Sequence, residues 1–94
     1  MQLFTLGLNH QSAPLAMRER MAFAGERLVE AAHDLKIRLG ELLEESAILS
    51  TCNRTEVYCA TPQTPLASSA LQQWIASQGG LRAGDIRSLT YSLP

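Results

Sequence analysis

Hydrophobic residues repeat along this chain with two different periods. Four segments alternate between apolar and polar positions, the period-2 pattern of a half-buried strand: residues 3–8, 47–50, 56–61 and 89–93. In the first, Phe4, Leu6 and Leu8 share one side. In the third, Val57 and Cys59 share a side, so we expect Cys59 to pack against helices. The pattern therefore predicts four strands.

Two longer segments repeat their apolar residues every three or four positions, as amphipathic helices do. The first covers residues 26–39, with its apolar stripe at Leu28, Ala32, Leu35 and Leu39. We expect Gly40 to end it in a left-handed conformation. The second runs from Pro65 to Gln78 with Thr64 as its cap. Trp74 lies on its apolar stripe and is predicted to be a core residue.

Shorter signals complete the pattern. Pro14 permits a helical turn before Met21, with Ser12 as a cap, and Gly84–Asp85 indicates a turn. The predicted order is strand, helix, strand, strand, helix, strand. That order favours an α+β fold of the ferredoxin-like βαββαβ type, a four-stranded antiparallel sheet with both main helices on one face. Residues 1–94 are predicted to form a single domain.

Composition narrows the class of protein. The 94 residues are 46% hydrophobic and 18% charged, and the formal net charge is -1. Without clustered Lys and Arg, we expect no dedicated nucleic-acid-binding surface. No apolar run approaches the roughly 20 residues of a membrane helix. Cys52 and Cys59 are seven residues apart, a spacing that fits neither a redox pair nor a zinc site, so we expect free thiols, no metal and a cytoplasmic setting.

A polar segment between the second and third predicted strands carries the candidate chemistry. It reads Ser50-Thr51-Cys52-Asn53-Arg54-Thr55-Glu56. Cationic and hydrogen-bonding neighbours lower the pKa of a thiol, and the thiolate is the form that attacks carbonyl groups, so Cys52 is the candidate nucleophile. The alternative is that Cys52 is a small buried apolar residue, the commoner role for a lone cysteine.

Other polar residues near this segment have two interpretations each. Arg54 offers a planar fork for a substrate carboxylate, or it forms an ion pair with Glu56, which could also orient it. Thr51 and Asn53 are candidate hydrogen-bond donors to substrate, and Ser50 is a supporting hydroxyl. We expect Asn9 to fix its own loop. His10 either bonds the loop backbone or assists the thiol.

Three segments together resemble a known family. The string STCNRTE, the sequence GLNHQSAP over residues 7–14, and Arg18-Glu19-Arg20 resemble the N-terminal catalytic domain of glutamyl-tRNA reductase, over residues 1–60. The resemblance implies that Cys52 attacks the ester of glutamyl-tRNA and forms a thioester, while Thr51, Asn53 and Arg54 hold the glutamyl group. Hydride from NADPH would then give glutamate-1-semialdehyde, in the first step of five-carbon tetrapyrrole synthesis.

The same resemblance implies parts that these residues lack. No GxGxxG fingerprint is present, so NADPH is expected to bind a domain outside this chain, which would be an excised fragment unable to reduce its substrate alone. The family further implies a homodimer that passes its product to an aminomutase. The rival hypotheses are a non-catalytic ferredoxin-like binding module and a protein-interaction domain that associates through Tyr58 or Tyr91.

Overall fold

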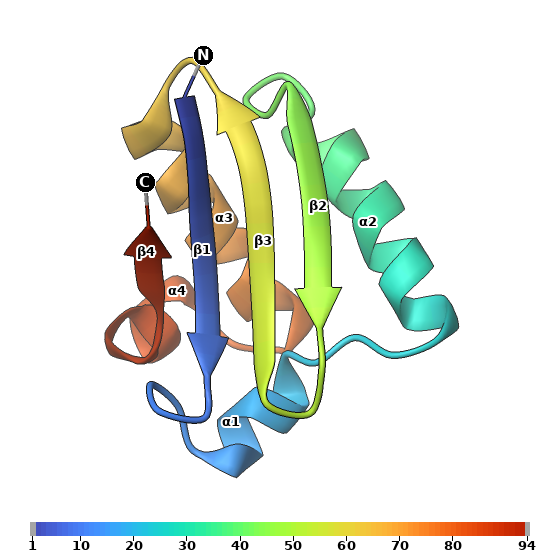
Figure 1. The fold of residues 1–94 in the computed structure, drawn as a ribbon, viewed down its shortest axis with the longest axis vertical. Helices are drawn as coiled ribbons and strands as arrows, with labels where there is room; N and C mark the ends of the chain where they lie inside the picture. Colours follow the sequence, from blue (N-terminus) through green and yellow to red (C-terminus); the bar gives the residue numbers. More distant parts are fainter. Residues whose placement is uncertain (1, 94) are drawn as a thin grey trace.

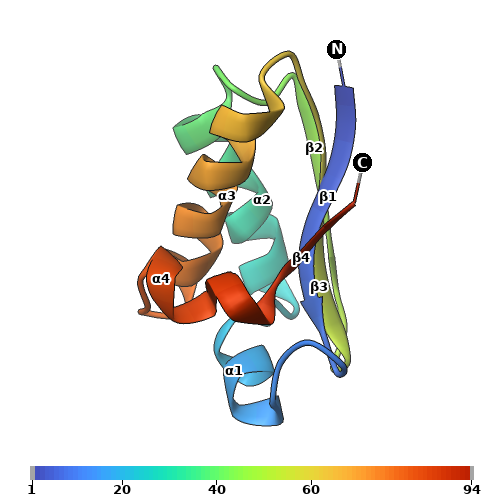
Figure 2. The same cartoon turned by 90° about the vertical axis from the view of Figure 1, so that its left-hand side faces the viewer.

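The computed structural model describes residues 2–93 and has four strands in one antiparallel sheet, with the helices packed against one of its faces (Figures 1 and 2). The strand order is β2-β3-β1-β4. In chain order the elements are β1 (Gln2–Asn9), α1 (Leu15–Arg20), α2 (Glu26–Leu39), β2 (Glu45–Ser50), β3 (Arg54–Thr61), α3 (Thr64–Gln78), α4 (Ala83–Ile86), the 3-10 helix η1 (Arg87–Leu89) and β4 (Tyr91–Leu93).

The strand register brings distant segments to one end of the sheet. β1 pairs with β3 from Gln2 opposite Thr61 to Asn9 opposite Arg54. β2 pairs with β3 as far as Ser50 opposite Thr55. The end of β1 and the turn between β2 and β3 therefore lie side by side, and α1 lies at the same end of the molecule (Figure 1).

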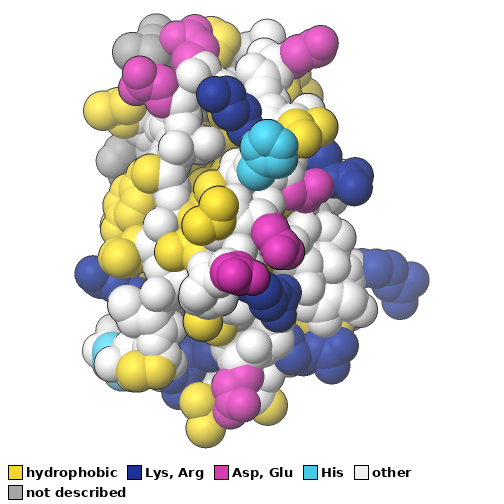
Figure 3. Space-filling view, turned by 90° about the vertical axis from the view of Figure 1, so that its right-hand side faces the viewer, with side chains coloured by type: hydrophobic (Ala, Val, Ile, Leu, Met, Phe, Trp, Pro, Cys, Tyr) yellow, Lys and Arg dark blue, Asp and Glu magenta, His cyan; other side chains and the backbone are white. Residues whose placement is uncertain are grey.

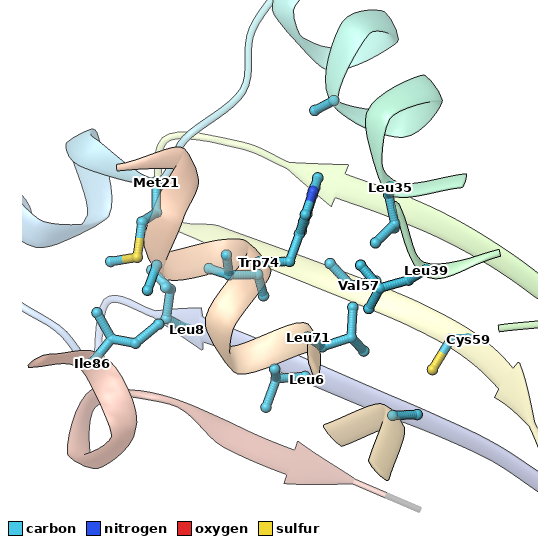
Figure 4. Packing of buried hydrophobic residues seen from close by; sticks show 14 of the residues in the cluster. Leu6, Leu8, Met21, Leu35, Leu39, Val57, Cys59, Leu71, Trp74 and Ile86 are labelled. Carbon is cyan, nitrogen blue, oxygen red and sulfur yellow. The ribbon is translucent and has the colours of Figure 1, made fainter. Parts of the chain in front are cut away.

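The core lies between the sheet and helices α2 and α3, and Figure 4 shows its packing. β1 contributes Phe4, Leu6 and Leu8, the side predicted from the alternation. β3 contributes Val57 and the buried Cys59, as expected. Each fully buried aliphatic side chain stabilises the fold by about 1.5–3 kcal/mol, so this layer supplies most of the driving force for folding. Trp74 is also a core residue, as predicted.

The opposite face of the sheet carries no helix among the described residues. Exposed hydrophobic side chains lie on it at Leu3, Tyr58 and Leu93. In Figure 3 this face lies along the left edge, where hydrophobic side chains gather, and charged side chains of both signs cover the side of α2. No helix within residues 2–93 is long and apolar enough to cross a membrane.

Helix α2 has the predicted bounds, but two details of the prediction are wrong. The structure buries Ala31 and exposes Ala32, because alanine is too small to mark one face of a helix when both positions lie near the stripe. Gly40 is right-handed, with φ −60° and ψ −21°. The chain instead continues through a turn in which the amides of Leu42 and Leu43 donate to the Leu39 carbonyl.

Three local predictions about helix ends also need correction. Thr64 is the first residue of α3, not its cap, and its hydroxyl donates to Gln2 Oε1. Ser12 does not cap α1, because its hydroxyl bonds Asn9. Asp85 lies within the short helix α4, where its carboxylate accepts a hydrogen bond from the Arg82 amide at 2.9 Å.

The strands differ from their predicted bounds mainly at their ends. β2 begins at Glu45 and β3 begins at Arg54, each two residues earlier than predicted. β4 covers only Tyr91–Leu93, because residue 89 belongs to η1. The earlier start of β3 matters for the site, since it fixes Arg54 in the sheet next to β1.

Candidate active site

The polar segment forms a tight turn at the end of the β2–β3 hairpin, and Thr51 holds it together. The Thr51 amide donates to the Arg54 carbonyl at 2.7 Å. Its hydroxyl oxygen accepts hydrogen bonds from the amides of Asn53 and Arg54, both at 3.2 Å. Such local bonds give a short turn a defined shape. The Thr51 hydroxyl proton remains available to donate outward.

Cys52 lies at the tip of this turn as an exposed free thiol. Its backbone carbonyl accepts a hydrogen bond from Arg18 Nη1 at 3.1 Å, and Arg18 Nε donates to the Ala13 carbonyl at 3.1 Å. Helix α1 thus anchors the turn and places a cation beside the backbone of Cys52. The sequence drew attention to Arg18 only within the Arg18-Glu19-Arg20 string and did not predict this role.

The second cysteine has a different environment. Cys59 is buried in the core, and burial raises the pKa of its thiol to about 11, because a thiolate is poorly solvated there. Of the two free cysteines, only Cys52 is exposed to solvent.

Arg54 begins β3 beside the turn and faces the carboxylate of Glu56. Its Nε lies 3.6 Å from Glu56 Oε1, and half of its side chain (51%) is exposed. The predicted ion pair is present, and the Arg54 side chain remains half exposed beside it. No side-chain hydrogen bond within residues 2–93 involves the terminal nitrogens of Arg54, so its planar fork can still accept a ligand carboxylate.

Glu56 is more enclosed than the sequence suggested, since only 8% of its side chain is exposed. Tyr58 donates to its Oε1 and Tyr91 donates to its Oε2, each at 2.5 Å. Burial alone would raise the pKa of the Glu56 carboxyl, but the two hydrogen bonds and the nearby Arg54 outweigh it and hold that pKa below the usual value. Glu56 is therefore a carboxylate at neutral pH.

Of the remaining predicted residues, Asn9 and Ser50 form hydrogen bonds within the fold, and His10 is exposed. Asn9 fixes its own loop, as expected, because its Oδ1 accepts from the amides of Gln11 and Ser12. His10 is exposed in that loop, one residue beyond the pairing of Asn9 with Arg54. Ser50 does not face the thiol, since its hydroxyl accepts from the Phe23 amide at 2.9 Å on the helix side of the sheet.

Within residues 2–93, neither the glycine pattern of a dinucleotide site nor a group of metal ligands is present. Gly79 and Gly80 follow the end of α3, and Gly84 lies inside α4, so none of them links a strand to a helix N-terminus, the position where phosphates bind. Within the same residues no three His, Cys, Asp or Glu side chains are grouped to hold a metal.

Comparison with known proteins shows which family the chain belongs to. The family model described as "Glutamyl-tRNAGlu reductase, N-terminal domain" matches residues 6–93. Proteins named glutamyl-tRNA reductase from Thiobacillus denitrificans and Aromatoleum aromaticum are 47% and 45% identical over the whole chain, and one from Nitrosomonas europaea is 45% identical over 99% of it. The chain spans 21% of the length of each. The chain therefore belongs to the glutamyl-tRNA reductase family, as its N-terminal domain.

Proposed function

We propose that this domain takes the glutamyl group from glutamyl-tRNA onto Cys52 as a thioester, the first half of the glutamyl-tRNA reductase reaction. The observation that carries the proposal is the exposed thiol of Cys52 on a turn fixed by Thr51 and Arg18. The rival hypothesis of a non-catalytic module requires Cys52 to be buried and inert. In this turn Cys52 is exposed instead.

The chemistry follows from the thiolate. The sulfur of Cys52 attacks the acyl carbon of the ester, a carbon–sulfur bond forms, and the carbon–oxygen bond to the tRNA ribose breaks. The released ribose oxygen takes up a proton. The exposed His10, in the loop beside Arg54, is the candidate to donate that proton.

Recognition of the amino acid falls to the residues around the thiol. The half-exposed guanidinium of Arg54 pairs with the side-chain carboxylate of the glutamyl group through two parallel hydrogen bonds. The Thr51 hydroxyl and the Asn53 side chain supply further donors to the bound group. A glutaminyl group has an uncharged side chain and would lose the charge attraction to Arg54.

The wider assignment rests on the family. The strand order and the two main helices on one face support a ferredoxin-like arrangement for the domain. Reduction to glutamate-1-semialdehyde, on the route to tetrapyrroles, needs a hydride donor, and we propose that this donor is NADPH bound by the remaining length of the enzyme. A homodimer that passes its product to an aminomutase, working in the cytoplasm, completes the proposal.

Mass spectrometry tests the acyl transfer. The chain is incubated with glutamyl-tRNA, digested under acid conditions that preserve thioesters, and the peptide containing Cys52 is examined. We expect a gain of one glutamyl group on Cys52 that is absent from Cys52→Ala and absent from Cys59 in both proteins. A glutamyl group that still appears in Cys52→Ala at the same level would overturn the proposal.

A further inference from the structure

A cluster of residues on the open face of the sheet surrounds Glu56, and we call Gly7, Glu56, Tyr58 and Tyr91 the Glu56 cluster. Three strands contribute to it: Gly7 from β1, Glu56 and Tyr58 from β3, and Tyr91 from β4. In the register of the sheet, Gly7 lies opposite Glu56 on one side and opposite Tyr91 on the other. Strand β1 therefore lies between the Glu56 carboxylate and the Tyr91 hydroxyl that donates to it.

Gly7 makes the contact across β1 sterically allowed. A Cβ atom at position 7 would lie 2.7 Å from Glu56 Cγ and 3.1 Å from the Tyr91 hydroxyl. Carbon atoms in contact are normally 3.5–4.0 Å apart, so any side chain larger than hydrogen would displace the glutamate. The Glu56 side chain thus lies across the bare backbone of Gly7 and reaches Tyr91 on the far side.

Both oxygens of the carboxylate are held in this position. Tyr58 donates to Oε1 and Tyr91 donates to Oε2, each at 2.5 Å, the short distance expected for a hydroxyl bonded to a charged acceptor. With both oxygens occupied, the carboxylate has a fixed plane and a fixed position. Oε1 is also the atom that faces Arg54 Nε at 3.6 Å.

We propose that the Glu56 cluster positions the Arg54 guanidinium for the substrate carboxylate, and that Tyr91 and Gly7 are thereby determinants of specificity for glutamyl over glutaminyl groups. Nε of Arg54 faces Glu56 Oε1 and half of the Arg54 side chain is exposed, so a shift of the glutamate would also shift the guanidinium that binds the substrate. This inference rests on the proposed function. Tyr91 and Gly7 are positioning residues, because they act only through Glu56 and Arg54.

The first measurement does not depend on acyl transfer. The side-chain ¹⁵N–¹H signal of Arg54 Nε reports how rigidly the guanidinium is held. We expect its order parameter to fall in Tyr91→Phe, which keeps the ring and removes only the hydroxyl, and in Tyr58→Phe. Ser92→Ala is the matched control, a neighbour on β4 that has no contact with Glu56 in the side-chain hydrogen bonds of residues 2–93, and it should match wild type. An unchanged Arg54 signal in both tyrosine variants overturns the positioning role.

The second measurement is selectivity. Single-turnover acylation of Cys52 is compared for glutamyl-tRNA and glutaminyl-tRNA. We expect the preference for glutamyl to fall roughly tenfold in Tyr91→Phe and to remain at the wild-type value in Ser92→Ala, since misplacing a binding group by about 1 Å can cost up to roughly 100-fold. A rate reduced equally for both substrates would show a merely structural effect and would overturn the specificity role. Failure of wild-type Cys52 to be acylated at all would overturn the proposed function, and the Arg54 signal would still decide the positioning.

Discussion

Replacing Gly7 with alanine tests the packing around Glu56 most severely. The added methyl group would lie 2.7 Å from Glu56 Cγ, 3.0 Å from the Thr55 carbonyl oxygen and 3.1 Å from the Tyr91 hydroxyl. The side-chain contacts can be relieved only by moving groups that are hydrogen-bonded to each other, and the carbonyl belongs to a central strand. Overpacking of this kind costs about 1–3 kcal/mol. Replacing glycine with alanine also stabilises the fold by about 0.5–1 kcal/mol, because glycine loses more backbone entropy on folding, and this offsets part of the cost.

The midpoints of these two ranges leave a net loss of about 1.3 kcal/mol in the free energy of unfolding, measured by urea denaturation monitored through Trp74 fluorescence. For a domain of this size the melting temperature should fall by roughly 5–10 °C. Gly84→Ala is the matched control, because position 84 has no atom within 4 Å of the added methyl group and lies in α4. It should be neutral or stabilise the protein by up to about 1 kcal/mol.

A double-mutant cycle identifies the cause of the loss. In a Glu56→Ala background the nearest clashing atom is gone, so Gly7→Ala should cost at least about 0.5 kcal/mol less than it does in the wild type. An unchanged free energy of unfolding for Gly7→Ala, or an identical cost in both backgrounds, would refute the reasoning that Glu56 lies across Gly7.

Three further outcomes follow from the structure. Iodoacetamide at pH 8 should alkylate Cys52 in the native protein and leave Cys59 unmodified until urea unfolds the chain, since a thiol of pKa about 11 is only about one thousandth thiolate at that pH; equal rates would contradict the burial of Cys59. Arg18→Met removes the bonds to the Ala13 and Cys52 carbonyls and should lower the free energy of unfolding by about 1–3 kcal/mol; loss of the bond to Cys52 should speed hydrogen exchange in residues 51–53, and unchanged exchange would show that α1 does not anchor the turn. The folded pKa of Glu56 lies below the ordinary value of 4.5, so its stabilisation is complete above about pH 4.5 and is lost as the pH falls through the folded pKa. Glu56→Gln should therefore flatten the loss of stability as the pH falls below about 4.5 in urea titrations, and a slope equal to the wild type would contradict that assignment.

Patterns that depend on neighbouring residues could be predicted well from the sequence. The α2 helix has its predicted bounds because its polar face and its leucines repeat at helical spacing over 14 residues. The inward side of β1 followed from strict alternation at Phe4, Leu6 and Leu8. The polar turn around Cys52 was predicted as a link between two strands, and the structure places it there with its thiol exposed.

Features that depend on distant residues were missed. Glu56 was interpreted as a local partner for Arg54, but its burial depends on Tyr91, which is 35 residues away, and on the bare backbone of Gly7. The bond between Arg18 and the Cys52 carbonyl spans 34 residues. No spacing rule connects such positions, because only the sheet register and the packing of α1 bring them together.

The most direct test of the account counts both products of the first chemical step. The chain is mixed with glutamyl-tRNA in a single turnover, and the uncharged tRNA released is measured alongside the glutamyl group bound to protein and sensitive to neutral hydroxylamine. The account predicts one tRNA released for each glutamyl group on Cys52, with neither product formed by Cys52→Ala. Release of tRNA by Cys52→Ala at the wild-type rate, with no glutamyl group held by the wild-type thiol, would contradict it.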